Sequence, residues 1–226
     1  MLRNSRLPAL AALALALVTA AIALIAYVAP EDADQGLSQK IFYFHVPIAL
    51  TAYVLFGWGA WKAFVHLWQR EPDADLESYV AIHHGVIFGV LTLVTGSIWA
   101  KISWGVWWAW SSNQLVLFLV LFLFYSAYFM LRFSIEPGPR RTNASAVYAL
   151  FGVALIPVSF LAIRLANDFI HPTVFTSQGP QMSGLMFFTF CVSWAALLAL
   201  AACLYHLELA GKRLDARLRE LRELLA

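Results

Sequence analysis

Charged residues are scarce in this sequence: they make up 12% of its 226 residues, whereas 62% are hydrophobic. An average soluble domain carries about 25% charged residues, so this chain lacks the polar surface that a water-soluble fold needs. The net charge of +2 is small, and no basic patch indicates nucleic-acid binding. These absences predict a protein embedded in lipid, with no nucleic-acid partner.

Cysteine and the common catalytic motifs are also rare or missing. The two cysteines, Cys191 and Cys203, fall inside one apolar run. They form no CxxC or zinc motif, and we interpret both as core-facing or lipid-facing residues. The sequence has no Walker, GxSxG or HExxH motif, and no apolar stretch holds paired carboxylates. We therefore predict no catalytic residue.

Six apolar stretches are long enough to cross the roughly 30 Å hydrocarbon core of a bilayer. They lie near residues 8–29, 46–68, 79–100, 114–133, 145–165 and 184–207. Each is predicted to be a helix, because a helix satisfies its own backbone hydrogen bonds in lipid. The first follows two arginines, as a secretory signal would, but its apolar run is longer and five more spans follow, so we expect a retained anchor. The predicted fold is all-α: a polytopic six-transmembrane-helix bundle forming one domain over residues 1–226.

Lysine and arginine are distributed unequally between the two predicted sides. If both termini lie inside, twelve of the 15 basic residues are on the inner side. The outer side then holds Lys40, Lys101 and Arg164. This asymmetry predicts cytoplasmic N- and C-termini. The loops after the first, third and fifth spans are therefore expected to face outward.

Two of the six histidines lie on the predicted outer side. His45 stands at the start of the second span, and His171 follows the fifth. Two imidazoles can complete the axial positions of a haem iron, so both are candidate axial ligands, although each alone is also typical of a solvated span end. The remaining histidines lie near the inner face and are interpreted as ordinary span-end residues: His66, His83, His84 and His206.

A tryptophan-rich segment, residues 104–110, occupies the middle outer loop. Trp104, Trp107 and Trp108 have i, i+3, i+4 spacing, so a short interfacial helix would place three indoles on one side, with Trp110 following. Interfacial tryptophans commonly serve only as membrane anchors. Indoles also stack on flat rings, and four in seven residues exceed what an anchor needs. The segment is therefore a candidate platform for haem.

Two basic residues near this platform are candidate partners for haem propionates. Lys101 ends the third span, and Arg164 lies near the end of the fifth. Cations in or beside a span are costly and often functional, and Arg can bind a carboxylate through two hydrogen bonds. Arg164 is equally well placed to pair with Asp168 at i+4.

These residues resemble a known family. Residues 104–110 resemble the WGxWWxWD motif of the tryptophan-rich haem-handling (WWD) proteins of cytochrome c maturation. Residues 40–47, Lys-Ile-Phe-Tyr-Phe-His-Val-Pro, resemble the first outer histidine stretch of the CcmC, or haem exporter protein C, family. Residues 92–101 resemble the span that leads into its tryptophan motif. The similarity covers nearly the whole chain.

The resemblance implies a haem-handling function. Such a protein binds haem b, non-covalently and transiently, at the outer face of the bacterial inner membrane and delivers it to a CcmE-type chaperone. Its expected partners are the ABC components CcmA and CcmB, the small membrane protein CcmD and membrane lipid. His45 matches the first axial ligand position, His171 approximately matches the second, and the tryptophans match the platform. The final Asp of the motif is Ser111 here, so handover would proceed without that acid.

Two other functions stay open from the sequence. A haem lyase or cytochrome c synthase would act on apocytochrome, but the chain lacks additional outer domains to hold one. A permease subunit of an ABC exporter for haem or another solute would need a polar route, and the spans offer few charges, with Arg164 near an end. We therefore expect a haem-binding transfer protein without catalytic turnover.

Overall fold

The computed structural model describes residues 6–31, 35–165, 174–176 and 178–225. Its α-helices are α1 (Arg6–Ala23), α2 (Phe42–Gln69), α3 (Pro72–Trp104), α4 (Asn113–Ser134), α5 (Pro139–Gly152), α6 (Leu155–Leu165) and α7 (Gly184–Leu225). Helix α1 continues as a π-helical turn (Leu24–Val28), and a 3₁₀ turn (Leu37–Ile41) precedes α2. Strands β1 (Phe175–Thr176) and β2 (Gly179–Pro180) pair antiparallel, with Phe175 opposite Pro180.

Six segments of the described chain are long and apolar enough to cross a membrane, which confirms the all-α polytopic prediction. The fifth segment combines α5 and α6. The helix breaks between Gly152 and Leu155, because Pro157 lacks an N–H donor and its ring would clash with the carbonyl of Val153. The sequence analysis predicted one continuous helix here and did not use this proline.

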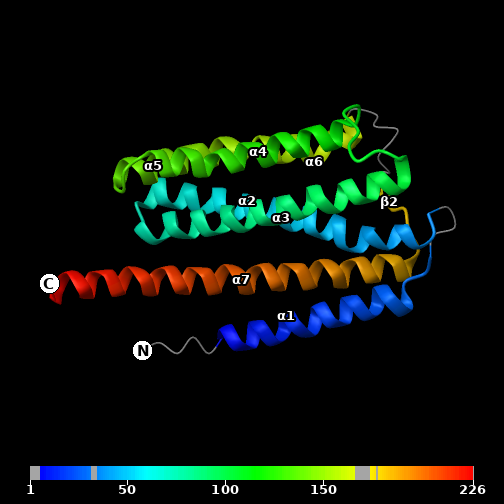
Figure 1. Cartoon of the computed structure of the whole chain (residues 1–226), viewed down its shortest axis with the longest axis horizontal. Coiled ribbons are helices and arrows are strands. Elements are labelled where there is room, and N and C mark those ends of the chain that lie inside the picture. Colours follow the sequence, from blue (N-terminus) through cyan, green and yellow to red (C-terminus); the bar gives the residue numbers. More distant parts are fainter. Residues whose placement is uncertain (1–5, 32–34, 166–173, 177, 226) are drawn as a thin grey trace.

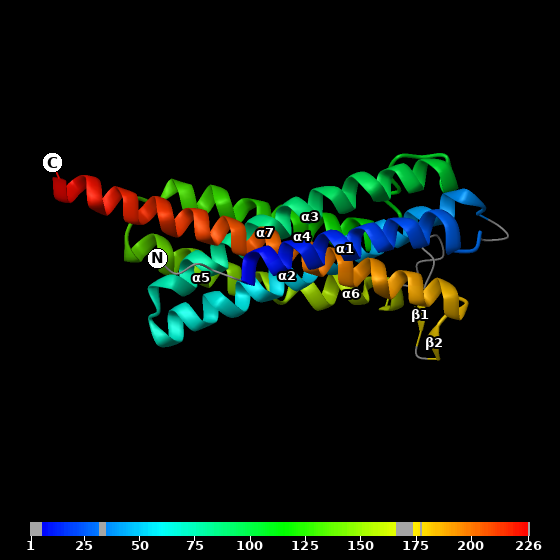
Figure 2. The same cartoon turned by 90° about the horizontal axis from the view of Figure 1, so that it is seen from below.

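The helices form three layers (Figure 1): α4, α5 and α6 at the top, α2 and α3 in the middle, and α1 beside α7 at the bottom. Seen from below, α1 and α7 lie over the other helices (Figure 2). One end of the bundle holds the β hairpin, the start of α2 and the end of α3, and we call it the hairpin end. At the opposite end, the turn end, α2 turns into α3, α4 turns into α5, and α7 ends.

Two glycines allow α2 and α3 to pack closely. A Cβ at Gly59 would lie 2.6 Å from Cγ1 of Ile82, and one at Gly85 would lie 2.6 Å from the ring of Phe56. Small residues at helix contacts let backbones approach in lipid, where packing rather than the hydrophobic effect drives association. Phe56 also stacks on Tyr125 of α4, with 4.2 Å between ring centroids. The α2–α3 pair is therefore the centre of the bundle.

The last helix extends well beyond the apolar stretch from which it was predicted. The sequence analysis ended this span near residue 207, but α7 continues to Leu225. In the extension, Arg213 lies 2.9 Å from a carboxylate oxygen of Asp73 and 3.1 Å from one of Glu77, both on α3. These contacts hold the polar part of α7 against the turn end, where hydropathy gives no signal.

Candidate functional site

A cavity of about 580 Å³ lies at the hairpin end, within the roughly 300–1,000 Å³ typical of ligand sites. Its walls come from α2, α3, α4, α6, the hairpin, α7 and the loop that follows α3. Eleven of the 23 described lining residues are Phe, Tyr or Trp, and none of these 23 is Lys, Arg, Asp or Glu. The cavity therefore suits a flat apolar ligand rather than a charged one.

His45 is the imidazole in the cavity wall. It lies in the first turn of α2, and its half-buried ring packs against α3. A Cβ at Gly96 of α3 would lie 2.8 Å from the His45 Cε1 atom, so the glycine makes the space in which the ring sits. His45 was predictable from the sequence, whereas the position of Gly96 opposite its ring was not.

A hydrogen bond to α3 orients the ring of His45. Nδ1 of His45 lies 2.9 Å from Oγ1 of Thr95. The Thr95 hydroxyl also lies 2.8 Å from the carbonyl oxygen of Leu91 and 3.3 Å from that of Thr92, so all these contacts are satisfied together when the hydroxyl donates to a carbonyl and accepts from an Nδ1–H of the ring. The lone pair of the ring is then on Nε2. An imidazole held in this way by its other nitrogen is the usual arrangement of a metal-ligating histidine.

The tryptophan-rich segment is not the short interfacial helix that its spacing predicted. Trp104 is the last residue of α3, because Gly105 adopts a left-handed conformation (φ +74°) that ends the helix. Residues 105–112 then run as a loop to α4. Trp104 and Trp108 line the cavity, whereas Trp107 and Trp110 are 61% and 73% exposed and lie outside its wall. Trp110 nevertheless contacts Trp108, with 5.8 Å between the ring centroids, so two indoles line the cavity and one of the outer two packs against one of them.

Two indole N–H groups in the cavity wall have no acceptor within the described part of the chain. They belong to Trp108 and to Trp194 of α7, and both nitrogen atoms are buried. A buried donor without an acceptor costs about 1–3 kcal/mol. Trp194 was not predicted as a site residue, since it lies within a long apolar run that reads only as a span.

The remaining candidates are placed as follows. The Lys101 ammonium donates to the carbonyl of Gly105 at 2.9 Å and lies outside the cavity wall. Arg164 lies in α6, but its side chain is outside the described residues, as is all of His171. The described chain resumes three residues after His171, at Val174, which lines the cavity.

Two aromatic residues of the cavity wall are also partly exposed in the described structure. Phe160 of α6 and Phe187 of α7 both line the cavity, and they are 42% and 38% exposed, respectively.

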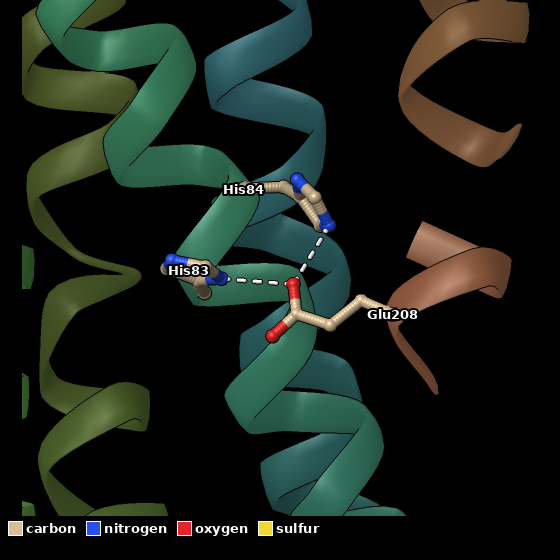
Figure 3. A group of neighbouring side chains, drawn as sticks. All are labelled: His83, His84 and Glu208. Carbon is tan, nitrogen blue, oxygen red and sulfur yellow. Dashed lines mark hydrogen bonds and ion pairs between the residues drawn. The ribbon is translucent and has the colours of Figure 1, made fainter. Parts of the chain in front are cut away.

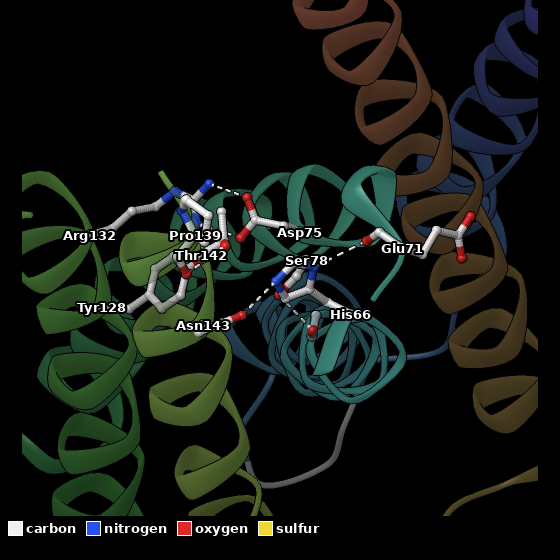
Figure 4. Close-up of polar contacts among 10 residues, drawn as sticks. His66, Glu71, Asp75, Ser78, Tyr128, Arg132, Pro139, Thr142 and Asn143 are labelled. Atoms are coloured by element: carbon white, nitrogen blue, oxygen red, sulfur yellow. Dashed lines mark hydrogen bonds and ion pairs between the residues drawn. The ribbon is translucent and has the colours of Figure 1, made fainter. Parts of the chain in front are cut away.

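The inner histidines lie at the other end of the bundle. His83 and His84 of α3 flank the carboxylate of Glu208 of α7 (Figure 3). His66 of α2 joins the backbone carbonyl of Glu71 (3.1 Å) and the side chain of Asn143 on α5 (3.3 Å; Figure 4). The cavity wall includes none of the four predicted inner histidines, which are His66, His83, His84 and His206.

A buried ion pair in the same turn-end network holds α4 against α3 (Figure 4). The Arg132 guanidinium donates to both carboxylate oxygens of Asp75, at 2.8 and 2.6 Å. It also lies 3.3 Å from the Tyr128 hydroxyl and 4.9 Å from the centroid of Tyr79. The sequence analysis did not pair these residues, because they are 57 positions apart.

Comparison with known proteins identifies the family. The family model described as CcmC, heme exporter protein C, matches residues 1–223. The chain belongs to the CcmC family. It is 30% identical over 202 residues to "Heme exporter protein C" of Paracoccus denitrificans, covering 88% of this chain and 82% of that one. The corresponding protein of Bradyrhizobium diazoefficiens is 29% identical, covering 88% and 75%.

A plant relative extends the CcmC match beyond bacteria. The "Putative cytochrome c biosynthesis ccmC-like mitochondrial protein" of Marchantia polymorpha is 26% identical over 192 residues, which cover 85% of this chain and 81% of the relative. The resemblance on which the sequence analysis drew is thus confirmed as membership of the CcmC family.

Proposed function

We propose that this CcmC-family chain binds haem in the cavity at the hairpin end and delivers it to a periplasmic CcmE-type chaperone for cytochrome c maturation. The observation that carries the proposal is the His45 imidazole in an aromatic cavity wall, held through Nδ1 by the hydroxyl of Thr95. Relatives named heme exporter protein C support haem as the ligand.

His45 and His171 are the proposed axial ligands. His171 lies three residues before Val174 in the cavity wall. Neutral imidazoles from two sides give a six-coordinate low-spin iron. His171 is the proposed second ligand from its place in the sequence, and it lies outside the described residues.

The porphyrin ring would occupy the aromatic part of the cavity, against Trp104 and Trp108. Because no charged residue is among the described lining residues, the propionates are expected to point out of the cavity. Lys101, which lies outside the wall, and Arg164 are the proposed cationic partners. The exposed Trp107 and Trp110 are the proposed outer part of the platform, where the chaperone would approach.

The proposed location is the bacterial inner membrane, with both termini in the cytoplasm. The start of α1 and the end of α7 point toward the same end of the bundle, and the basic residues concentrate there. The cavity would then face the periplasm, where the chaperone works. CcmA, CcmB and CcmD are the proposed membrane partners, and bound haem b is held without a covalent bond.

Absorbance spectra of the purified full-length chain test this proposal. Wild-type protein reconstituted with haem should give a six-coordinate low-spin spectrum. His45→Ala and His171→Ala should each lower haem content and change the spectrum. His206→Ala is the matched control, because His206 is exposed and remote from the cavity. If both outer histidine variants keep the wild-type spectrum and haem content, the ligand assignment is wrong.

A transfer assay distinguishes handover from the other functions. Haem-loaded protein mixed with an apo CcmE-type chaperone should lose haem to the chaperone without forming a thioether. Thioether formation on apocytochrome by this chain alone would instead indicate a lyase or synthase. Solute flux that depends on the chain, but not on His45 or His171, would indicate a permease subunit.

A further inference from the structure

Three metal-ligating side chains meet between α3 and α7, remote from the cavity. Nδ1 of His83 lies 2.8 Å from Oε2 of Glu208, and Nε2 of His84 lies 3.0 Å from the same oxygen. The three ligand atoms all lie within 4.8 Å of one another. Neighbouring residues of a helix point about 100° apart, and both imidazoles meet one carboxylate because Glu208 lies between them (Figure 3).

Hydrogen bonding leaves His84 incompletely satisfied. The residue is buried, and neither ring nitrogen makes a hydrogen bond of good geometry within the described part of the chain. Its Nε2 lies at an ion-pair distance of 3.0 Å from Oε2 of Glu208. Buried polar groups are nearly always paired. An ion bound between the three side chains would give the buried His84 ring a direct bond at Nε2.

We propose that His83, His84 and Glu208 form a binding site for a divalent transition-metal ion of the Zn²⁺ type. Two imidazoles and one carboxylate are a known zinc donor set, and a fourth position stays open for water. Ligand atoms around a tetrahedral Zn²⁺ lie roughly 3.3 Å apart, given metal–ligand distances of about 2.0–2.1 Å. The His83–Glu208 and His84–Glu208 separations are already within about 0.5 Å of that value.

The surroundings of the three ligands also define their accessibility and charge. The His83 side chain is 40% exposed in the described structure. Its ring stacks on Tyr79. The ammonium of Lys212 lies 3.4 Å from the other oxygen of Glu208 and 4.8 Å from the Tyr79 ring centroid. Lys212 opposes a bound cation, so its removal should strengthen metal binding.

The position of the site indicates what a bound ion would do. His84 precedes Trp104 by 20 residues of continuous helix, which places it roughly 30 Å from the tryptophan end of α3. The ion would join α7 of the bottom layer to α3 of the middle layer. It would therefore stabilise the bundle at the turn end without contacting haem.

Binding of Co²⁺ to the full-length chain in detergent, without an affinity tag, tests the site. One equivalent should bind with the intense visible absorption of tetrahedral Co²⁺, and Zn²⁺ should displace it. Glu208→Gln, His83→Ala and His84→Ala should each weaken binding more than about 100-fold, beyond the 10- to 100-fold cost of losing an outer-shell partner. Lys212→Met should tighten binding, and His206→Ala, two residues from Glu208, should leave it unchanged.

Each outcome bears on the site independently of haem. If His84→Ala does not fold, the nearly isosteric Glu208→Gln still tests the ligand set. Substoichiometric binding, or equal binding by wild type and Glu208→Gln, means an adventitious ion only and overturns the proposal. The haem spectrum should be the same in wild type and Glu208→Gln, so failure of the metal site and failure of the haem site are separate results.

Discussion

Replacement of Gly96 by alanine should displace the proposed haem ligand without removing it. The new methyl carbon would lie 2.8 Å from Cε1 of His45, whereas ordinary carbon contacts begin near 3.4 Å. The ring must therefore move by about 0.6 Å. Such a shift strains the hydrogen bond from Nδ1 to Thr95, which is 2.9 Å long in the native protein.

The expected loss of haem affinity follows from how small a displacement a ligand-binding side chain tolerates. Binding groups generally work within about 0.5 Å of their productive position, and overpacking of a close contact costs about 1–3 kcal/mol. Since about 1.4 kcal/mol corresponds to tenfold in affinity, Gly96→Ala should weaken haem binding roughly 5- to 150-fold.

Haem titration of wild type and variant, followed by absorbance, measures this change. Gly57→Ala is the matched control, because Gly57 is also helical and no atom lies within 4 Å of its added Cβ. Alanine favours a helix by about 0.5–1 kcal/mol relative to glycine, so the control should bind haem normally and lose no stability. Wild-type haem affinity and spectrum in Gly96→Ala would refute the placement of His45 against α3.

Three further changes test the site and the bundle. Thr95→Val removes the hydroxyl that contacts Nδ1 of His45 and should weaken haem binding about 10- to 100-fold. Thr95→Ser keeps the hydroxyl and should bind haem normally. Equal haem affinities of the Val and Ser variants would contradict an Nδ1–H tautomer held by this hydroxyl. Asp75→Asn leaves the buried Arg132 without its counter-charge and should destabilise the protein by about 3–5 kcal/mol in detergent unfolding; an unchanged unfolding midpoint would show that the pair is not essential. Gly59→Ala should lower the free energy of unfolding by about 1–3 kcal/mol in the same assay, because its Cβ would lie 2.6 Å from a side chain of α3. An unchanged free energy of unfolding would show that α2 and α3 do not pack closely at this glycine.

The transmembrane segments were predictable because lipid imposes a simple composition on them. Apolar runs located all six spans, but they placed the start of α3 near residue 79 rather than at Pro72 and the end of α7 near 207 rather than at Leu225. These helices continue as polar structure held by contacts such as Arg213 with Glu77. Hydropathy detects the part of a helix that lies in lipid. The polar extensions of the helices depend on contacts between residues that are far apart in the sequence, and hydropathy does not detect these.

The candidate site was predictable only where sequence chemistry is unusual. His45 and the tryptophans were identifiable as an outer imidazole and a dense indole cluster. The i, i+3, i+4 spacing then gave the wrong local structure, because Gly105 ends α3 within the segment. Thr95 and Trp194 carry no signal in an apolar run, and they gain a role only through their positions beside His45 and in the cavity wall.

Imidazole rescue of a His45→Gly variant tests axial ligation most directly. The purified variant, loaded with haem, should lose the six-coordinate low-spin spectrum, and added imidazole should restore it by occupying the space of the missing ring. His206→Gly, treated identically, should show the wild-type spectrum with and without imidazole. A wild-type spectrum for His45→Gly before imidazole is added would contradict the assignment of His45 as a haem ligand.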